Sequence, residues 1–465
     1  MLQAVLSKID ATQAETMGFL FELLRFKSIG TDPAFAADCR ACAHWLRAWV
    51  EVRGFAANLH ETTGQPVLLA RWGAERKDLP HVLFYGHYDV QPVDPLTLWE
   101  SQPFDPRLGQ TARGAKAIFA RGATDDKGQV MTFLTAATRW LEVVGELPFR
   151  LTVILEGDEE GDSEHLDRFL KAHVEALSAD IAMVCDTEMW DDKTPAITTS
   201  LRGCIAEELT ISAAHIDLHS GYFGGPATNP LKVLSALIAK VHDQKGRITI
   251  PGFYDGVKRP SVARRAGWKK LGLGARQFLG EVGLKTPAGE QAFTLAEQIW
   301  ARPTVEVNGL WGGYTAEGRK TVLPAEAHAK LSFRLVDGQN PAHVRKAFRS
   351  FIKKNLPKDC RASFVASGGD STGITIDENS PWVKMAAAAL RNEWGVKAAI
   401  VGSGVSIPVV ECFRKHQKME SLLVGFSRFD DAAHSPNEKY DVESFHKGAR
   451  SWARLFAEIA EGKWK

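Results

Sequence analysis

The sequence has few cysteines and no excess of charge of either sign. Its 465 residues include 6 cysteines, and 57 Lys and Arg residues balance 56 Asp and Glu residues to a formal net charge of +1. Few, scattered cysteines are typical of a reducing compartment, so we expect a cytoplasmic protein. A charge near zero excludes the basic excess of a non-specific nucleic-acid binder and the acidic excess of a disordered chain. We therefore expect small-molecule or protein partners and no nucleic acid.

Long apolar segments are also missing. No run of about 18 apolar residues occurs, so the sequence predicts no membrane span. Residues 1–30 carry apolar side chains at helical spacing, interrupted by Lys8 and Asp10, which predicts an amphipathic surface helix and no signal peptide. The pair Cys39 and Cys42 has zinc-like spacing, but no second pair follows and the segment has a helical pattern. Helix packing is the favoured interpretation of that pair.

Short apolar runs rich in β-branched and aromatic residues are present, and several of them alternate with helical stretches. These runs cover residues 81–89, 151–161, 180–188, 397–404 and 421–428. The alternation predicts an α/β domain with a mostly parallel sheet. Residues 206–376 contain alternating strand patterns, one long helix and a basic loop region, which predicts an inserted α+β domain. We therefore expect a split first domain, residues 1–205 and 377–465, around the insertion 206–376.

Acidic and histidine side chains gather where several of these predicted strands end. They are His87, Asp89, Asp125, Asp126, Glu159, Glu160, Asp186 and His434. In parallel sheets, binding groups collect at the carboxyl ends of the strands. Carboxylates mixed with imidazoles suit zinc or a similar divalent ion, and a site with two histidines can hold two ions. Each residue alone has an ordinary interpretation, for example as a helix cap. Their joint occurrence favours a metal site.

These motifs resemble the five metal-site motifs of the M20 family of metallopeptidases. The matching segments are Gly86-His87-x-Asp89, Gly122-Ala-Thr-Asp125-Asp-Lys127-Gly128, Glu159-Glu160-Gly161, Asp186 and His434. Within that family, the segments GHYDVQP, RGATDDKG, DLHSG and KTVLPAEAHAKLSFRLV are most similar to the carnosinase-like dipeptidases. The resemblance implies a zinc-exopeptidase-like catalytic domain in the split part of the chain. It also implies that the insertion serves as a lid and dimerisation domain.

The resemblance further implies two zinc ions per subunit, with Mn²⁺ or Co²⁺ as possible substitutes. Asp125 would bridge the two ions. His87 and Asp186 would complete the ligands of one ion, and Glu160 and His434 would complete those of the other. Two such cations lower the pKa of a bound water and polarise a scissile carbonyl.

Three further residues receive catalytic roles from the resemblance. Glu159 would be the general base, because a carboxylate beside a metal ligand can take the proton of the attacking water. Asp89 would orient the imidazole of His87. His219 would reach the active site of the other subunit of a homodimer and stabilise the oxyanion, although on the residues alone it could merely cap a turn.

Four residues are predicted to contact the substrate. Arg334 matches the family's arginine for a terminal carboxylate, which a guanidinium can hold with two parallel hydrogen bonds; it could also be an exposed strand residue. Gly404 and Ser406 lie in the stretch Ser-Gly-Val-Ser-Ile-Pro at 403–408, where related dipeptidases have Glu-Gly-Gly-Ser-Ile-Pro. The valine places a branched side chain where backbone should approach the substrate. Asn308 is assigned to the pocket from its position alone.

The expected function is that of a di-zinc hydrolase. It would cleave the amide bond of dipeptides, or the C-terminal residue of short peptides, through a metal-bridging hydroxide activated by a glutamate base. An N-acyl-amino-acid deacylase with the same metal site is the alternative. A non-catalytic metal- or peptide-binding homologue is less consistent with the sequence, because no ligand or base is lost. Residues 402–406 do not form the Gly-x-Ser-x-Gly elbow of serine hydrolases.

Overall fold

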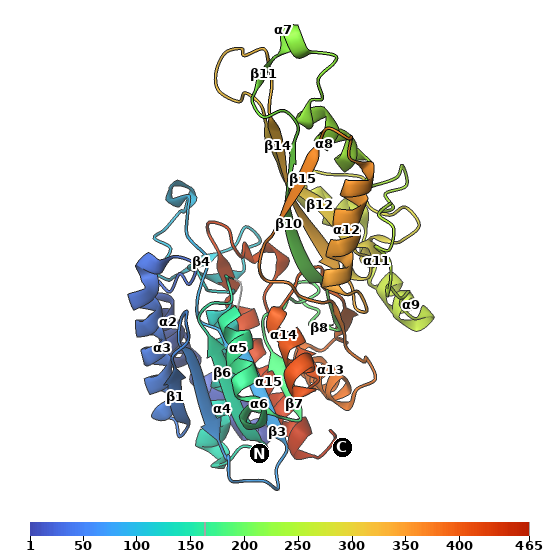
Figure 1. Ribbon diagram of the computed structural model, residues 1–465. Helices are drawn as coiled ribbons and strands as arrows, with labels where there is room; N and C mark the ends of the chain where they lie inside the picture. The colour runs from blue at the N-terminus through green and yellow to red at the C-terminus, as the bar shows by residue number, and fades with distance from the viewer. Residues whose placement is uncertain (162–163, 465) are drawn as a thin grey trace. The chain divides into compact units, whose positions relative to one another are not determined.

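The computed structural model describes residues 1–161 and 164–464, which divide into two compact units (Figure 1). Unit 1 comprises Met1–Thr199, Ile376–Val401 and Cys412–Lys465, and unit 2 comprises Ser200–Thr375 and Gly402–Glu411. The sequence interpretation left residues 402–411 in the split domain. In the structure they group with unit 2, where the Ser403 amide donates to the Ser200 carbonyl at 2.8 Å and the Arg202 guanidinium donates to the Gly404 carbonyl at 2.9 Å.

An eight-stranded sheet forms the centre of unit 1, in the order β1-β2-β6-β3-β7-β18-β8-β17. Its strands are β1 (Ala56–His60), β2 (Val67–Trp72), β3 (His81–His87), β6 (Arg150–Glu156), β7 (Ile181–Val184), β8 (Ala196–Thr198), β17 (Ala399–Val401) and β18 (Ser421–Leu423). The four central strands β6, β3, β7 and β18 are parallel neighbours. At one side of the sheet, β2 pairs antiparallel with both β1 and β6. The predicted α/β fold with a mostly parallel sheet is confirmed.

Helices cover this sheet because the apolar faces of the helices and the apolar faces of the sheet must both be removed from water. They are α1 (Leu2–Ala11), α2 (Gln13–Leu24), α3 (Ala36–Glu51), α4 (Lys127–Val144), α5 (Glu164–Ala172), α6 (Val174–Leu177), α13 (Pro381–Trp394) and α15 (Val442–Ala460). Phe84 of β3 stacks on Phe133 of α4 with ring centroids 3.8 Å apart, and Trp452 of α15 meets Phe133 edge-on at 5.2 Å. These buried aromatic contacts fix α4 and α15 against the strands.

The N-terminal part of unit 1 follows the predicted pattern with one difference. The amphipathic segment forms two helices, α1 and α2, separated at Thr12. Cys39 and Cys42 are both fully buried on α3, which agrees with a packing role. Among the described residues, no helix is long and apolar enough to cross a bilayer.

A small three-stranded sheet in unit 1 joins two segments that are distant in the chain. It has the order β19-β5-β4, with β4 (Arg107–Gln110), β5 (Lys116–Phe119) and β19 (Lys439–Asp441). Lys439 pairs with Phe119 in the antiparallel β19·β5 ladder. The chain before β19 is thereby held beside the chain that follows β5.

Unit 2 is built on a four-stranded antiparallel sheet in the order β12-β14-β10-β15. Its strands are β10 (Gly203–Ser212), β12 (Thr304–Gly312), β14 (Glu326–Leu335) and β15 (Arg361–Ala366). Side chains along β10 alternate between buried and half-buried, so one face of the sheet forms a core. Two helices, α8 (Pro230–Ala239) and α12 (Pro341–Asn355), pack on the sheet and close that core.

Candidate metal centre

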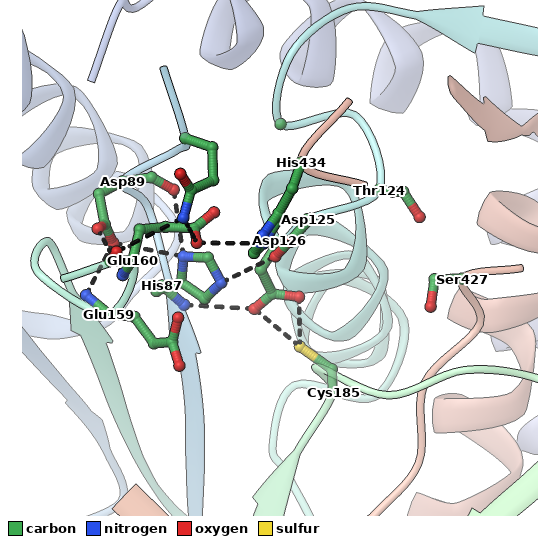
Figure 2. Close-up of polar contacts among 12 residues, drawn as sticks. His87, Asp89, Thr124, Asp125, Asp126, Glu159, Glu160, Cys185, Ser427 and His434 are labelled. Carbon is green, nitrogen blue, oxygen red and sulfur yellow. Dashed lines mark hydrogen bonds and ion pairs between the residues drawn. The ribbon is translucent and has the colours of Figure 1, made fainter. Parts of the chain in front are cut away.

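Five side chains with metal-ligand chemistry converge in unit 1, four of them labelled in Figure 2. His87 is the last residue of β3, Glu160 follows β6 and Asp186 follows β7, and these three strands are parallel. Their carboxyl ends therefore lie at one edge of the sheet. Asp125 precedes α4, and His434 precedes β19.

Asp125 lies at the centre of this group. Its Oδ1 is 3.2 Å from Nε2 of His87, and its Oδ2 is 2.9 Å from Nε2 of His434. The same His434 nitrogen is 3.2 Å from Oε2 of Glu160. The potential ligand atoms form two sets, His87 with Asp125 and Asp186, and Asp125 with Glu160 and His434; within each set all atoms lie within 4.8 Å of one another. One carboxylate shared by two sets of three can serve two neighbouring cations.

The electrostatics of the group also suit cations. Burial, together with the nearby Asp125 carboxylate, raises the pKa of Asp186 to about 7, and the same two causes raise the pKa of Glu160. Burial opposes a charge on His87, but its contacts with Asp125 and Asp89 outweigh burial and raise the pKa of that imidazole. Crowded carboxylates repel one another, and a divalent cation offsets this repulsion. The donor set therefore fits divalent metal ions.

Asp89 connects one histidine to the loop that carries Glu159 and Glu160 (Figure 2). Its side chain is fully buried, and Oδ1 lies 3.3 Å from Nδ1 of His87. The Asp89 carboxylate also accepts hydrogen bonds from the backbone amides of Glu159, at 3.2 Å, and Glu160, at 3.0 Å. Burial, with the carboxylates of Asp186 and Glu160, raises the pKa of Glu159 well above its usual value. A carboxyl of raised pKa holds an abstracted proton more firmly.

Asp126 takes a supporting position beside Asp125, and the peptide bond between the two is cis. The fully buried Asp126 carboxylate accepts hydrogen bonds from the backbone amide of His87, at 3.3 Å, and from Sγ of Cys185, at 3.4 Å (Figure 2). Asp126 thus holds the end of β3 in place and belongs to neither set of potential ligands.

Glu438 is a supporting residue that sequence reasoning missed. Its buried carboxylate receives four hydrogen bonds, two at each oxygen. The donors are the Arg121 guanidinium at 2.7 Å and the backbone amides of Gly122 at 2.9 Å, Thr124 at 2.9 Å and Asp125 at 3.1 Å. Glu438 therefore binds the loop of Asp125 to the segment that carries His434. The only signal in the sequence was a glutamate four positions after His434.

In unit 2, two of the residues predicted to bind substrate lie side by side. Arg334 of β14 donates to Oγ of Ser406 at 3.1 Å. Arg202, which the sequence reading did not single out, lies close by. Its burial, together with the charge of Arg334, lowers its pKa to about 10. Two neighbouring guanidinium groups and a hydroxyl have the chemistry to bind an anion. Gly404 contributes its carbonyl to Arg202, and a side chain at this position would approach that guanidinium to 2.9 Å.

The remaining predicted residues of unit 2 are exposed. His219 ends β11 (Leu218–His219), and its Nδ1 accepts a hydrogen bond from the Gly221 amide at 3.0 Å. It thus caps the short helix α7 (Ser220–Phe223). Asn308 lies at an irregularity of β12, where the pairing register shifts between Val307 and Gly309. The structure shows neither residue in contact with the Arg334 and Ser406 pair.

Comparison with known proteins places the chain in a family. The family model "Peptidase family M20/M25/M40" matches residues 83–458. The chain belongs to this family. It is 30% identical over 477 residues to the Cys-Gly metallodipeptidase DUG1 of Candida albicans, covering 97% of this chain and 96% of the relative. It is 27% identical over 406 residues to the human Beta-Ala-His dipeptidase, covering 85% of this chain and 78% of the relative.

Solved structures agree with this assignment. The M20 family metallo-carboxypeptidase Sso-CP2 from Sulfolobus solfataricus superposes with a TM-score of 0.85 at 29% identity, covering 96% of this chain and 99% of that one. The predicted resemblance to M20 metallopeptidases is therefore confirmed, and this M20 chain is an enzyme of the hydrolase class.

Proposed function

We propose that this M20 chain is a dinuclear zinc dipeptidase. The observation that carries the proposal is the position of Asp125, whose two carboxylate oxygens face two different histidines within two sets of potential ligands. His87 and Asp186 would hold one ion, and Glu160 and His434 would hold the other. Mn²⁺ or Co²⁺ can substitute for zinc, because oxygen and imidazole ligands accept each of these metals.

In the proposed mechanism, divalent cations held by these residues would supply Lewis-acid polarisation of the scissile carbonyl and would lower the pKa of the attacking water. Glu159 takes the proton of that water and returns it to the leaving amine. Burial and the carboxylates of Asp186 and Glu160 raise the pKa of Glu159, which favours the step in which it accepts that proton. Asp89 keeps the His87 ring in the orientation that points Nε2 toward Asp125.

The substrate class is argued from unit 2 and from the relatives. Arg334, Ser406 and the neighbouring Arg202 would bind the free carboxylate of a dipeptide. Relatives named Cys-Gly metallodipeptidase and Beta-Ala-His dipeptidase support dipeptides over N-acyl amino acids, which would present the same carboxylate. Gly404 and Asn308 would line the same pocket.

Unit 2 is further proposed as the lid and dimerisation part of a homodimer in which His219 stabilises the oxyanion of the partner's active site. Tyr222 and Phe223, next to His219 in sequence, are 80% and 45% exposed, which supports contact with a second copy. We place the enzyme in the cytoplasm, since none of its 6 cysteines forms a disulfide.

The test is a substrate panel with metal reconstitution. Metal-free protein should regain cleavage of dipeptides on addition of Zn²⁺, Mn²⁺ or Co²⁺, and dipeptides should be cleaved faster than N-acetyl amino acids. Glu159→Gln should lower kcat by roughly 100- to 10,000-fold, because a general base is lost, while the bound metal content is retained. Glu175→Gln, an exposed glutamate of unit 1, is the matched control and should keep full activity.

Near-full activity of Glu159→Gln would contradict the assigned base. Faster cleavage of N-acetyl amino acids than of dipeptides would instead establish the deacylase alternative.

A further inference from the structure

A third group of potential metal ligands lies in unit 1, outside the centre described above. Asp167 belongs to α5, Cys412 ends α14 (Pro408–Cys412), and His416 lies in the following π-helical turn, Phe413–Gln417. Oδ1 of Asp167 is 2.7 Å from Nε2 of His416 and 3.4 Å from Sγ of Cys412. The three ligand atoms all lie within 4.8 Å of one another. A carboxylate oxygen, a thiol sulfur and an imidazole nitrogen therefore face one point.

The local structure aims these three groups. Cys412 and His416 are four positions apart on a helical segment, so both project from the same side of it. Single π-helical turns are often found at functional sites, where they re-aim side chains. Asp167 presents Oδ1 to both residues, while its Oδ2 pairs with Lys171 one turn further along α5. Lys171 therefore occupies the other oxygen, and Oδ1 faces the two potential ligand partners, Cys412 and His416.

Burial and charge also favour a cation here. The side chains of Asp167 and His416 are 30% and 11% exposed, so the group is shielded yet accessible to an ion. Asp167 supplies a carboxylate oxygen, and Cys412 supplies a sulfur that binds zinc once its proton is lost, so the group offers the negative charge that a divalent cation needs.

We propose that Asp167, Cys412 and His416 bind a Zn²⁺ ion that is separate from the catalytic pair, with water in the fourth position. A thiolate with an imidazole selects zinc over Mg²⁺, Ca²⁺ or Mn²⁺. Binding displaces the thiol proton of Cys412 to solvent, so the ion gains one sulfur, one nitrogen and one oxygen ligand. The sets of potential ligands around Asp125 contain no sulfur, which makes the two sites chemically distinguishable.

Two of the three ligand separations can be compared directly with those of a tetrahedral zinc site. In a tetrahedral site, zinc bonds of roughly 2.0–2.1 Å to nitrogen and oxygen place these two ligands about 3.4 Å apart, and a zinc–sulfur bond of roughly 2.3 Å places the sulfur about 3.6 Å from the oxygen. The sulfur to oxygen separation of 3.4 Å is already close to this value, and the His416 to Asp167 hydrogen bond of 2.7 Å has to open. The ion would anchor α5, the helix that follows the Glu159 and Glu160 loop in the chain.

Cobalt substitution tests the site directly. A Co²⁺–thiolate bond absorbs in the near ultraviolet, whereas cobalt bound by oxygen and nitrogen does not give this band. We expect the band in cobalt-loaded wild-type protein, its loss in Cys412→Ser, and its weakening in His416→Gln. The matched control is Cys204→Ser, the other half-buried cysteine, which belongs to no ligand set among the described residues and should keep the band.

Two further readouts do not depend on activity. Native mass spectrometry should show one zinc ion fewer in Cys412→Ser than in Cys204→Ser. In the unmutated protein, Zn²⁺ should slow the alkylation of Cys412, and peptide mapping measures the rate of this reaction. A wild-type protein without the band, an unchanged band in Cys412→Ser, or alkylation unaffected by Zn²⁺ would overturn the site. Because the band reports only on the thiolate, its absence leaves the proposed dipeptidase reaction untouched.

Discussion

At the scale of single residues, three buried carboxylates that belong to neither set of potential ligands around Asp125 support the centre. Asp89, Asp126 and Glu438 each hold the backbone of a loop or strand end that carries a potential ligand. Such partners fix the orientation of the ligands before any ion arrives, and their loss typically costs metal affinity. Sequence reasoning found Asp89 through its spacing from His87, but Glu438 has no local pattern that distinguishes it from a surface glutamate.

Glu438→Gln should weaken metal binding by roughly 10- to 100-fold while the fold is retained. Each oxygen of Glu438 accepts two hydrogen bonds. In Glu438→Gln an amide NH₂ replaces one oxygen, and because it cannot accept hydrogen bonds, two of the donors lose their acceptor. Zinc titration against a competing chelator measures the effect. Glu443→Gln, whose side chain is 60% exposed on α15, is the control. Equal zinc affinity of the two variants would refute the positioning role.

Arg334→Ala should raise KM for dipeptides about tenfold or more and leave kcat nearly unchanged. The expected loss is that of a charge-assisted hydrogen bond to the substrate carboxylate, about 1.5–3 kcal/mol. Dipeptide amides, which lack this carboxylate, serve as the internal control and should be cleaved equally by variant and wild type. A similar loss on the amides would show that Arg334 acts through the fold of unit 2 instead.

At the scale of elements, the ends of the parallel strands and the small β19·β5 ladder place the potential ligands. The apolar runs of the sequence predicted β3, β6 and β7, and the polar cluster after each run marked where the strand ends. The pairing of β19 with β5 was not predictable, because each strand is short and its partner lies more than 300 residues away in the chain. That ladder brings the chain that carries His434 and Glu438 to Asp125.

The start of α4 is tightly packed against the loop of Asp125. A side chain at Gly128 would come within 1.9 Å of the Ala123 carbonyl and 2.7 Å of the Tyr440 ring. Gly128→Ala should therefore lower the free energy of unfolding by roughly 1–3 kcal/mol, through overpacking, and reduce zinc affinity. Urea unfolding and zinc titration measure the two effects.

Gly18→Ala is the matched control, since nothing lies within 4 Å of a side chain at that helical position. It should be neutral or stabilising by roughly 0.5–1 kcal/mol. If Gly128→Ala were as stable as this control, the close packing of α4 on the loop would be disproved.

At the scale of the whole molecule, the proposed homodimer makes a sharp prediction. If His219 acts in the partner's active site, Glu159→Gln and His219→Ala should each be inactive alone. Mixed dimers of the two variants contain one complete site. Equal mixing after dissociation should then restore about a quarter of wild-type activity, because half of the dimers are mixed and each has one working site.

Sedimentation of the wild type should show the dimer, and mixing Glu159→Gln with itself is the control. No recovery in the mixture, or an active monomer, would assign His219 to its own subunit or to the cap of α7 alone.

The sequence by itself determined the α/β fold class, the residue types of the centre and the family. Strand and helix periodicity is local, and the ligand residues stand at the ends of strands that this periodicity reveals. Only the tertiary structure decided which distant groups meet. It joined Glu438 to the Asp125 loop, brought Arg202 near Arg334, moved residues 402–411 into unit 2, and collected Asp167, Cys412 and His416 at one point. These contacts depend on packing between segments far apart in the chain, and local sequence patterns do not predict such packing.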